Sequence, residues 1–466
     1  MSSPFNEEKY KRLLEGLEIS EIMLGDVIKN NRIDAECYRK RNLFLNHIIE
    51  TFYHKLINDF ATVTDGEHGS PDLDDNSGIL YLSGHNVKDN VLDLSDVRYC
   101  SKELHIKNSR SALTTNSVLL SIVGTVGNAS VVYQDLIANT DRNVATIKNI
   151  SSIVNPYYLS TFLNSKFGKY QMQLLSTGNV QPLLNLLQVK SIKVCIPNIS
   201  FQSEIEQVVK SAHSNLQQSK SLYSEAEDIL LSELGLKGWQ PNNKPTNIKQ
   251  LKESYLASGR LDAEYYQPKY DEIESVIKKY RNGSDLIRNL FSQNTEVCDF
   301  KEEAYNYIEI GDINIGDGTA NYNLIQKDEL PDNAKRVLHK NDILISKVRP
   351  YRGAVSIIDI DDERLIGSGA FTVLRENSTY KKEVLQILLR TQIYKDWLLK
   401  WNVGSSYPVI KDEDILNLPI PKIPNQVQTE IAAYVQKSIS LRNEAKQLLE
   451  SAKLKVEDAI STPPFN

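Results

Sequence analysis

Two long stretches of the chain carry apolar residues at mixed spacings of three and four, which is the pattern of an amphipathic helix. The first stretch, 201–234, contains no proline or glycine, and Gly235 and Gly238 stand where a helix would stop. The second stretch, 428–460, has the same character. A helix of about 34 residues spans roughly 50 Å, which exceeds the needs of one compact domain. The pattern predicts two long helices that can pack along a shared apolar seam.

The remainder of the chain contains an internal repeat, with one copy ahead of each predicted long helix. The sequence Arg-Ile-Asp-Ala-Glu-Cys-Tyr at 32–38 recurs as Arg-Leu-Asp-Ala-Glu-Tyr-Tyr at 260–266. This match has an offset of 228, and further matches keep the same order at offsets of 225 or 226: 81–87 with 307–313, 116–121 with 341–346, Gly178 with Gly404, Pro182 with Pro408, and 202–205 with 428–431. Six ordered matches at nearly one offset predict a duplicated unit.

Each repeat mixes short strands with helices. Runs rich in β-branched residues, divided by glycine and asparagine turns, predict strands, and longer periodic stretches predict helices. We expect strands at 118–123, 129–133, 192–196, 343–346, 354–358 and 418–423, and helices at 4–28, 42–58, 156–175, 268–280 and 381–402. The fold class is therefore α+β.

The same patterns give domain boundaries. A stretch rich in proline and asparagine follows the first long helix and is typical of a linker. The expected parts are a first domain at 1–200, its long helix at 201–236, the linker at 237–247, a second domain at 248–426, and a second long helix with a tail at 427–466.

Composition narrows the class of protein. A chain of 466 residues that is 41% hydrophobic supports two or three domains with real cores. It has no signal peptide and no apolar run that would span a bilayer, so no membrane partner is expected. The four cysteines are far apart and form no CxxC pair, which argues against a zinc site or a disulfide framework and favours the reduced cytoplasm.

The distribution of charge favours a polyanionic partner more than the net charge does. A net charge of −6 argues against nucleic acid. Residues 51–100 hold three Lys/Arg and nine Asp/Glu, whereas 101–200 hold nine and three. In the second half, Asp342 is the single acid among six bases: Lys335, Arg336, Lys340, Lys347, Arg349 and Arg352. Two basic patches suit a polyanion bound at two places, and chance segregation of charge on solvated faces is the alternative.

No enzyme motif is found in the sequence. The tetrad Asn155-Pro156-Tyr157-Tyr158 resembles the Asn-Pro-Pro-Tyr element of DNA adenine methyltransferases, but it lacks the second proline and no glycine-rich cofactor loop precedes it. A helix start explains it fully, with Asn155 as the N-cap and Pro156 at the first helical position. The Gly124–Gly127 pair is interpreted as a turn between strands, and no metal-binding spacing of histidines occurs.

Several loops have side chains suited to DNA. Arginine bridges base edges in the major groove, tyrosine and lysine hold phosphates, and small or amide side chains allow close approach to a backbone or base. A plain exposed turn is the alternative for each loop. The candidates are Lys347, Arg349, Tyr351, Arg352, Ser405, Ser406 and Tyr407 in the second repeat, and Arg142, Asn143, Asn179 and Gln181 in the first.

Taken together, the duplicated motifs resemble those of the DNA specificity subunit of type I restriction–modification systems. The motifs that carry the resemblance occur in both copies, at 32–38 and 260–266, 81–87 and 307–313, 116–121 and 341–346, and 202–205 and 428–431. Each motif alone is loose, but their order and duplication are specific. The resemblance covers nearly the whole chain.

This resemblance implies an architecture and a set of partners. Each α+β domain would be a target recognition domain that reads one half of a bipartite site in double-stranded DNA. The domains would form a pseudo-two-fold repeat, joined by two antiparallel helices that act as a coiled-coil spacer. Two methyltransferase subunits would attach, with a restriction–translocation subunit as a further partner. AdoMet would belong to the methyltransferases, so this chain would carry no cofactor and no catalytic residue, and the family's loop contacts would fall on the candidates above.

The two copies differ where contacts are expected. Ser121-Ile122-Val123-Gly124 lacks the bases of Ser346-Lys347-Val348-Arg349, so the domains are expected to read different sequences. Two other functions stay open at this point: a stand-alone methyltransferase or nuclease fragment, and a scaffold subunit of another phage-defence complex.

Overall fold

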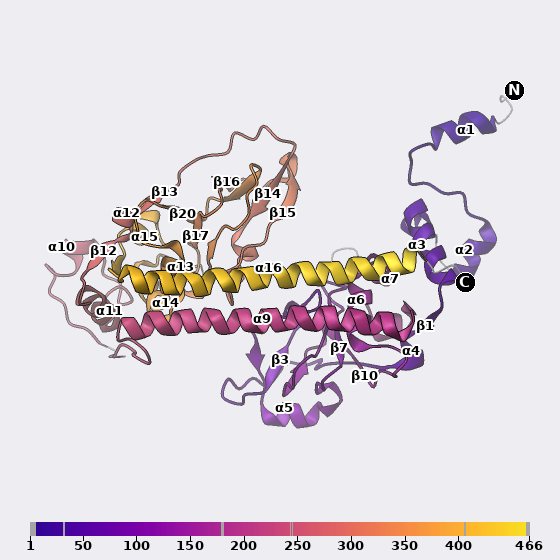
Figure 1. The fold of residues 1–466 in the computed structure, drawn as a ribbon, viewed down its shortest axis with the longest axis horizontal. Coiled ribbons are helices and arrows are strands. Elements are labelled where there is room, and N and C mark those ends of the chain that lie inside the picture. The colour runs from indigo at the N-terminus through magenta and orange to yellow at the C-terminus, as the bar shows by residue number, and fades with distance from the viewer. Residues whose placement is uncertain are drawn as a thin grey trace. The chain divides into compact units, whose positions relative to one another are not determined.

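The computed structural model describes residues 6–30, 33–178, 181–242, 244, 246–404 and 407–462. The chain divides into two compact units (Figure 1). The first unit comprises Met1–Asn215 with Glu444–Asn466, and the second comprises Leu216–Asn443. None of the described helices combines the length and the apolar composition that a membrane span requires.

Both long helices exist, and each contributes a segment to both units. Helix α9 runs from Ile199 to Glu233 and α16 from Asn425 to Ser461, against the predicted 201–234 and 428–460. Within the first unit the two segments lie side by side and antiparallel, because Lys455 pairs with Glu204 while Glu444 meets Asn215. Within the second unit, the Ser219 and Ser438 hydroxyls are 2.8 Å apart.

The first unit is built from short sheets. Its largest sheet has the strand order β2-β10-β7-β8, and a second has the order β6-β3-β9, in which β3 and β9 are parallel. Two-stranded sheets pair β1 with β11 and β4 with β5. The strands are β1 (His54–Leu56), β2 (Thr62–Asp65), β3 (Leu80–Leu82), β4 (Val87–Lys88), β5 (Val91–Leu92), β6 (Arg98–Tyr99), β7 (Val118–Ser121), β8 (Ala129–Val131), β9 (Ala138–Thr140), β10 (Val144–Lys148) and β11 (Lys193–Cys195).

The second unit repeats this plan. Its sheets have the orders β13-β20-β17-β18 and β15-β14-β19-β16, with β14 and β19 parallel, and β12 pairs with β21. The strands are β12 (Ser284–Leu286), β13 (Phe291–Gln293), β14 (Ala304–Ile308), β15 (Asn323–Gln326), β16 (Ala334–Val337), β17 (Ile343–Ser346), β18 (Val355–Ile357), β19 (Leu365–Ser368), β20 (Phe371–Glu376) and β21 (Pro419–Pro421). The sheets β2-β10-β7-β8 and β13-β20-β17-β18 have corresponding strands in the same order, which agrees with the repeat seen in the sequence.

Helices complete each core. In each unit, buried side chains of the sheet pack against those of the shorter helices and of both long-helix segments. The shorter helices are α1 (Glu7–Leu13), α2 (Leu24–Asn30), α3 (Lys40–Thr51), α4 (Ile57–Phe60), α5 (Lys102–Lys107), α6 (Pro156–Asn164), α7 (Lys166–Leu175), α8 (Leu186–Lys190), α10 (Tyr255–Ser258), α11 (Pro268–Lys278), α12 (Ile287–Leu290), α13 (Lys382–Arg390), α14 (Gln392–Leu398) and α15 (Asp412–Leu416).

Four predicted helices differ from the structure. The helix expected at 42–58 ends as α3 at Thr51, because the chain becomes extended at Phe52 and then forms β1, which pairs with β11. The stretch 156–175 is divided into α6 and α7 at Ser165, and 381–402 is divided into α13 and α14 at Thr391. Both residues are extended, and each side-chain oxygen accepts a backbone N–H of the following helix, so the residue caps a new helix instead of continuing the old one. The stretch 4–28 holds two short helices, because the chain leaves α1 just before Gly16, whose φ is +78°.

The start of α6 confirms the structural interpretation of the Asn155 tetrad. The Asn155 side-chain oxygen accepts the backbone N–H of Tyr157 at 2.9 Å and that of Tyr158 at 3.4 Å. Pro156 occupies the first turn, where its missing N–H costs nothing. The tetrad therefore caps a helix.

Candidate nucleic-acid interface

In the second unit, the candidate residues gather on two turns that are bonded to each other. The 347–353 turn joins β17 to β18, and the 403–409 turn lies against it. The Arg349 N–H donates to the Pro408 carbonyl at 2.7 Å, and the Ile410 N–H donates to the Lys347 carbonyl at 2.9 Å. These main-chain bonds bring Arg349 and Tyr407 together, although they are 58 positions apart.

Arg349 has an unusual backbone. Its φ of +49° and ψ of +54° lie in the left-handed region, which side chains other than glycine rarely adopt. Its guanidinium carbon lies 4.4 Å from the centre of the Tyr407 ring, a cation–π distance. A strained residue that also holds its side chain on an aromatic ring points to a functional position.

The other candidates on the 347–353 turn differ in availability. Lys347 is half-buried, and its ammonium lies 3.2 Å from the Asp412 carboxylate, so its charge is already neutralised within the unit. Tyr351 and Arg352 are exposed on a short 3-10 helix, Pro350–Arg352. Arg349, Tyr351, Arg352 and Tyr407 are thus the side chains that this surface offers to a ligand.

The first unit has the same pair of turns with different side chains. The Gly124 N–H donates to the Pro182 carbonyl at 3.2 Å, and the Leu184 N–H donates to the Ile122 carbonyl at 2.9 Å. Gly124 takes the place of Arg349 and also has a positive φ, +75°. Gln181 takes the place of Tyr407, and a Cβ at Gly124 would lie 3.5 Å from its amide nitrogen.

Arg142 and Asn143 lie beside this pair, on the turn between β9 and β10. The Asn143 carbonyl accepts the Ile122 N–H at 2.9 Å, which attaches this turn to the base of the 122–128 turn. The Asn143 amide donates to buried Asp141 at 3.0 Å, so this donor is already used. The Arg142 side chain is exposed and has no partner among the described residues. Arg142 and Gln181 are therefore the free polar groups of this surface.

Three candidates, Asn179, Ser405 and Ser406, lie outside the described residues.

The structure adds residues that sequence reasoning missed. Burial raises the pKa of the Asp141 carboxyl. Hydrogen bonds from Asn143 and the nearby Arg98 and His85 oppose this rise, so His85 lies close to the carboxylate. Glu67, whose carbonyl accepts the Arg142 N–H at 3.0 Å, joins the loop after β2 to the same surface. His85 follows β3 and Asp141 follows β9, and these strands are brought together by parallel pairing. No spacing in the sequence therefore relates these residues.

The predicted basic patches are wrong as continuous surfaces. Asp342 is buried and bonded to the Arg375 guanidinium at 2.7 Å, not to the six bases near it in sequence. Lys335, Arg336 and Lys340 precede β17 while Lys347 follows it, so about 13 Å of strand separates them.

The bases of 101–200 are similarly dispersed, because most of them have partners elsewhere in the first unit. Lys169 pairs with Asp89 at 2.9 Å, Lys193 with Glu50, and Lys148 donates to the Ala112 carbonyl at 3.0 Å. Electrostatic attraction to DNA would therefore come from a few arginines on turns and not from broad patches.

A metal site would require a cluster of acidic, histidine or cysteine side chains. Among the described residues, no three acidic, histidine or cysteine side chains come close enough to hold a metal ion. None of the four cysteines forms a disulfide.

Comparison with known proteins shows which proteins this chain is similar to. A family model described as "Type I restriction modification DNA specificity domain" matches residues 272–453, which include both turns of the second unit. The EcoBI specificity subunit of Escherichia coli is 28% identical over 46% of this chain and 42% of its own length, less than half of that relative. The MjaVIII specificity subunit of Methanocaldococcus jannaschii is 21% identical over 82% of this chain and 85% of its own length.

Solved structures are also similar. The S subunit of a type I restriction–modification system from M. genitalium is 13% identical, with a TM-score of 0.41 over 89% of this chain and 97% of that one. The family match and the curated relatives agree with each other and with the resemblance found in the sequence. Residues 272–453 therefore match a type I restriction modification DNA specificity domain, and the chain is similar to specificity subunits of type I restriction enzymes.

Proposed function

We propose that this chain is the non-catalytic reader of a type I restriction–modification complex, in which each unit reads one half of a bipartite DNA target. One observation carries the proposal: both units hold the same two turns together by the same main-chain bonds, yet present different side chains on them. A shared scaffold with variable turns is what two half-sites of different sequence require.

The side chains of each unit suit base edges. In the second unit, Arg349 would form a bidentate contact with guanine while Tyr351 and Arg352 hold phosphates. In the first, Arg142 would take the arginine role and Gln181 would suit adenine. Lys347 is assigned a supporting role, because its ion pair with Asp412 leaves it little free charge.

The long helices would act as the spacer and as the docking site for two methyltransferase subunits. Their facing residues are small or aliphatic and fully buried, as expected of a close antiparallel seam: Ile205, Val209, Ala212, Ala226 and Leu230 in α9, and Ile431, Val435, Ala445, Ala452 and Val456 in α16. AdoMet would bind the methyltransferases, and a restriction–translocation subunit would be a further partner.

Mapping of modified adenines in cells that express this chain with its methyltransferase partners tests the proposal. The expected result is one motif with two defined half-sites separated by a constant number of bases. Deletion of about one heptad from each long helix should change that separation by roughly 10 Å, or about three base pairs. A single continuous motif, or a separation that ignores the deletion, would contradict the proposal.

A further inference from the structure

Arg390, the last residue of α13, joins three parts of the second unit. Its guanidinium donates one bond to the Gly353 carbonyl, at 3.1 Å, and another to the Ile315 carbonyl, at 2.9 Å. The guanidinium carbon also lies 5.3 Å from the centre of the Tyr223 ring in α9. Gly353 closes the 347–353 turn that carries Arg349, so one side chain connects that turn to the long helix.

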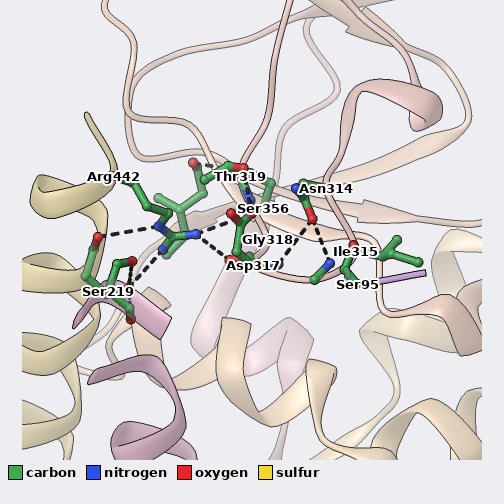
Figure 2. Close-up of polar contacts among 12 residues, drawn as sticks. Ser95, Ser219, Asn314, Ile315, Asp317, Gly318, Thr319, Ser356 and Arg442 are labelled. Carbon is green, nitrogen blue, oxygen red and sulfur yellow. Dashed lines mark hydrogen bonds and ion pairs between the residues drawn. The ribbon is translucent and has the colours of Figure 1, made fainter. Parts of the chain in front are cut away.

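The second of these parts, the 314–319 turn, is also bonded to Arg442 of α16 (Figure 2). Buried Arg442 donates to the Asp317 carbonyl at 2.7 Å and to the Ser438 hydroxyl at 3.2 Å. Ser438 in turn bonds to Ser219 of α9. The turn that receives Arg390 is therefore fixed to both long-helix segments of this unit and can serve as a rigid support.

Two glycines make the approach of Arg390 possible. Gly353 and Gly318 have φ values of +70° and +73°, which favour glycine. A Cβ at Gly318 would lie only 2.9 Å from the Arg390 guanidinium. The backbone is thus shaped around this side chain.

The support matters because Arg349 is in a strained conformation that local interactions alone do not favour. The turn is tied at its start by the bond from the Arg349 N–H to the Pro408 carbonyl, and at its end by Arg390. In the first unit, the position that matches Arg390 (390 − 226 = 164) is Asn164, which bonds to the N–H and carbonyl of Ala129. There the strained position is Gly124, which needs no such support.

We propose that Arg390 is a positioning residue for base reading by the second unit: it touches no DNA, and it holds the 347–353 turn so that Arg349 presents its guanidinium in one orientation. This inference rests on the proposed function and deepens it. It assigns the specificity of one half-site partly to a half-buried residue on a helix.

Modified adenines are mapped with the full chain, expressed together with its methyltransferase partners. Arg349→Gly first identifies the half-site read by the second unit. Arg390→Met, which keeps the length and removes the donors, should then weaken base preference in that half-site about tenfold, the scale of one lost base contact. The first half-site should be unchanged. Arg390→Lys should recover part of the preference, because it retains one donor.

Arg288→Met is the matched control, since it breaks the exposed pair with Glu413 in the same unit. It should leave both half-sites unchanged. If Arg390→Met fails to fold in a thermal unfolding measurement, Tyr223→Leu removes the ring beneath the guanidinium and should relax the same half-site. Equal loss at both half-sites, or an unaltered motif, would overturn the positioning role. A wild-type chain without a bipartite motif would instead overturn the proposed function.

Discussion

The two units place an arginine on different turns of one scaffold. In the second unit Arg349 lies between β17 and β18, where the first unit has Gly124. In the first unit Arg142 lies between β9 and β10, where the second has Gly369 (369 − 142 = 227). The bond that joins these two turns is main-chain in both cases, from Ile122 to Asn143 at 2.9 Å and from Lys347 to Ala370 at 3.0 Å.

This difference is what the proposed function requires if one fold is to serve two sequences. Main-chain bonds do not depend on side-chain identity, so the turns keep their positions while arginine moves from one turn to the other. The proposed readers therefore differ in which turn approaches the base edges as well as in which residues they carry.

The units also differ in how a long helix holds the sheet. In the first unit, buried His213 of α9 bonds to the Asn90 carbonyl at 2.7 Å and stacks on Tyr133 with the ring centres 3.9 Å apart. In the second unit, Arg442 of α16 bonds to the Asp317 carbonyl at the same distance. One attachment is a titratable imidazole, and the other is a guanidinium that stays protonated.

The largest expected effect is the loss of the second unit's attachment. Arg442→Met would leave the Asp317 carbonyl and the Ser438–Ser219 hydroxyls without their buried cationic partner, at a cost of about 2–3 kcal/mol in the free energy of unfolding. Urea unfolding measures this cost. His213→Leu in the first unit should cost less, because a neutral donor is removed, and an equal cost would show that the attachments do not differ.

Base reading gives the next effect. Arg349→Ala and Arg142→Ala should each weaken specific DNA binding by about 1–3 kcal/mol. Each loss should appear only with DNA that keeps the half-site of the mutated unit intact. Competition binding against DNA with one altered half-site measures this. An unchanged affinity and salt dependence for either variant would remove that arginine from the interface.

A smaller difference between the two units is expected from backbone strain, in the free energy of unfolding. At Arg349, glycine should be more stabilising than alanine by about 1 kcal/mol, because both lose the ring contact and only glycine relieves the left-handed strain. Gly124→Ala should cost about 1 kcal/mol for the same reason. The free energies of unfolding test both. An alanine as stable as glycine at Arg349 would mean that the turn is not strained.

The smallest effect is expected from pH. Burial lowers the pKa of His213 below its usual range, more than its bond to Asn90 raises it. The unfolded chain then binds the extra proton first, so the contribution of His213 is complete above about pH 6.5 and is lost as the pH falls below that value. His213→Gln keeps a donor and does not titrate, so it should flatten this part of the stability–pH profile. An identical profile would exclude His213 as its source.

Part of the candidate site was predictable from the sequence, because chain neighbours stay together. The 347–352 segment lies on one turn as expected, and the Asn155 cap follows from residues one to three positions apart. The partners of these residues were not predictable. Lys347 was expected to face DNA, but Asp412, 65 positions later, pairs with it. The six bases near Asp342 looked continuous in sequence, yet β17 separates them.

The sequence by itself determined the long helices, the duplication and the turns, because periodicity, repeated motifs and glycine positions act over short distances along the chain. Only the tertiary structure decided which charges are free and that Arg390 joins the turn to α9. It also decided that Arg349 has a left-handed backbone and that its guanidinium contacts the Tyr407 ring. These features depend on contacts between residues that are 37 to 167 positions apart (390 − 353 and 390 − 223), and a pattern along the chain contains no information about which distant residues will meet.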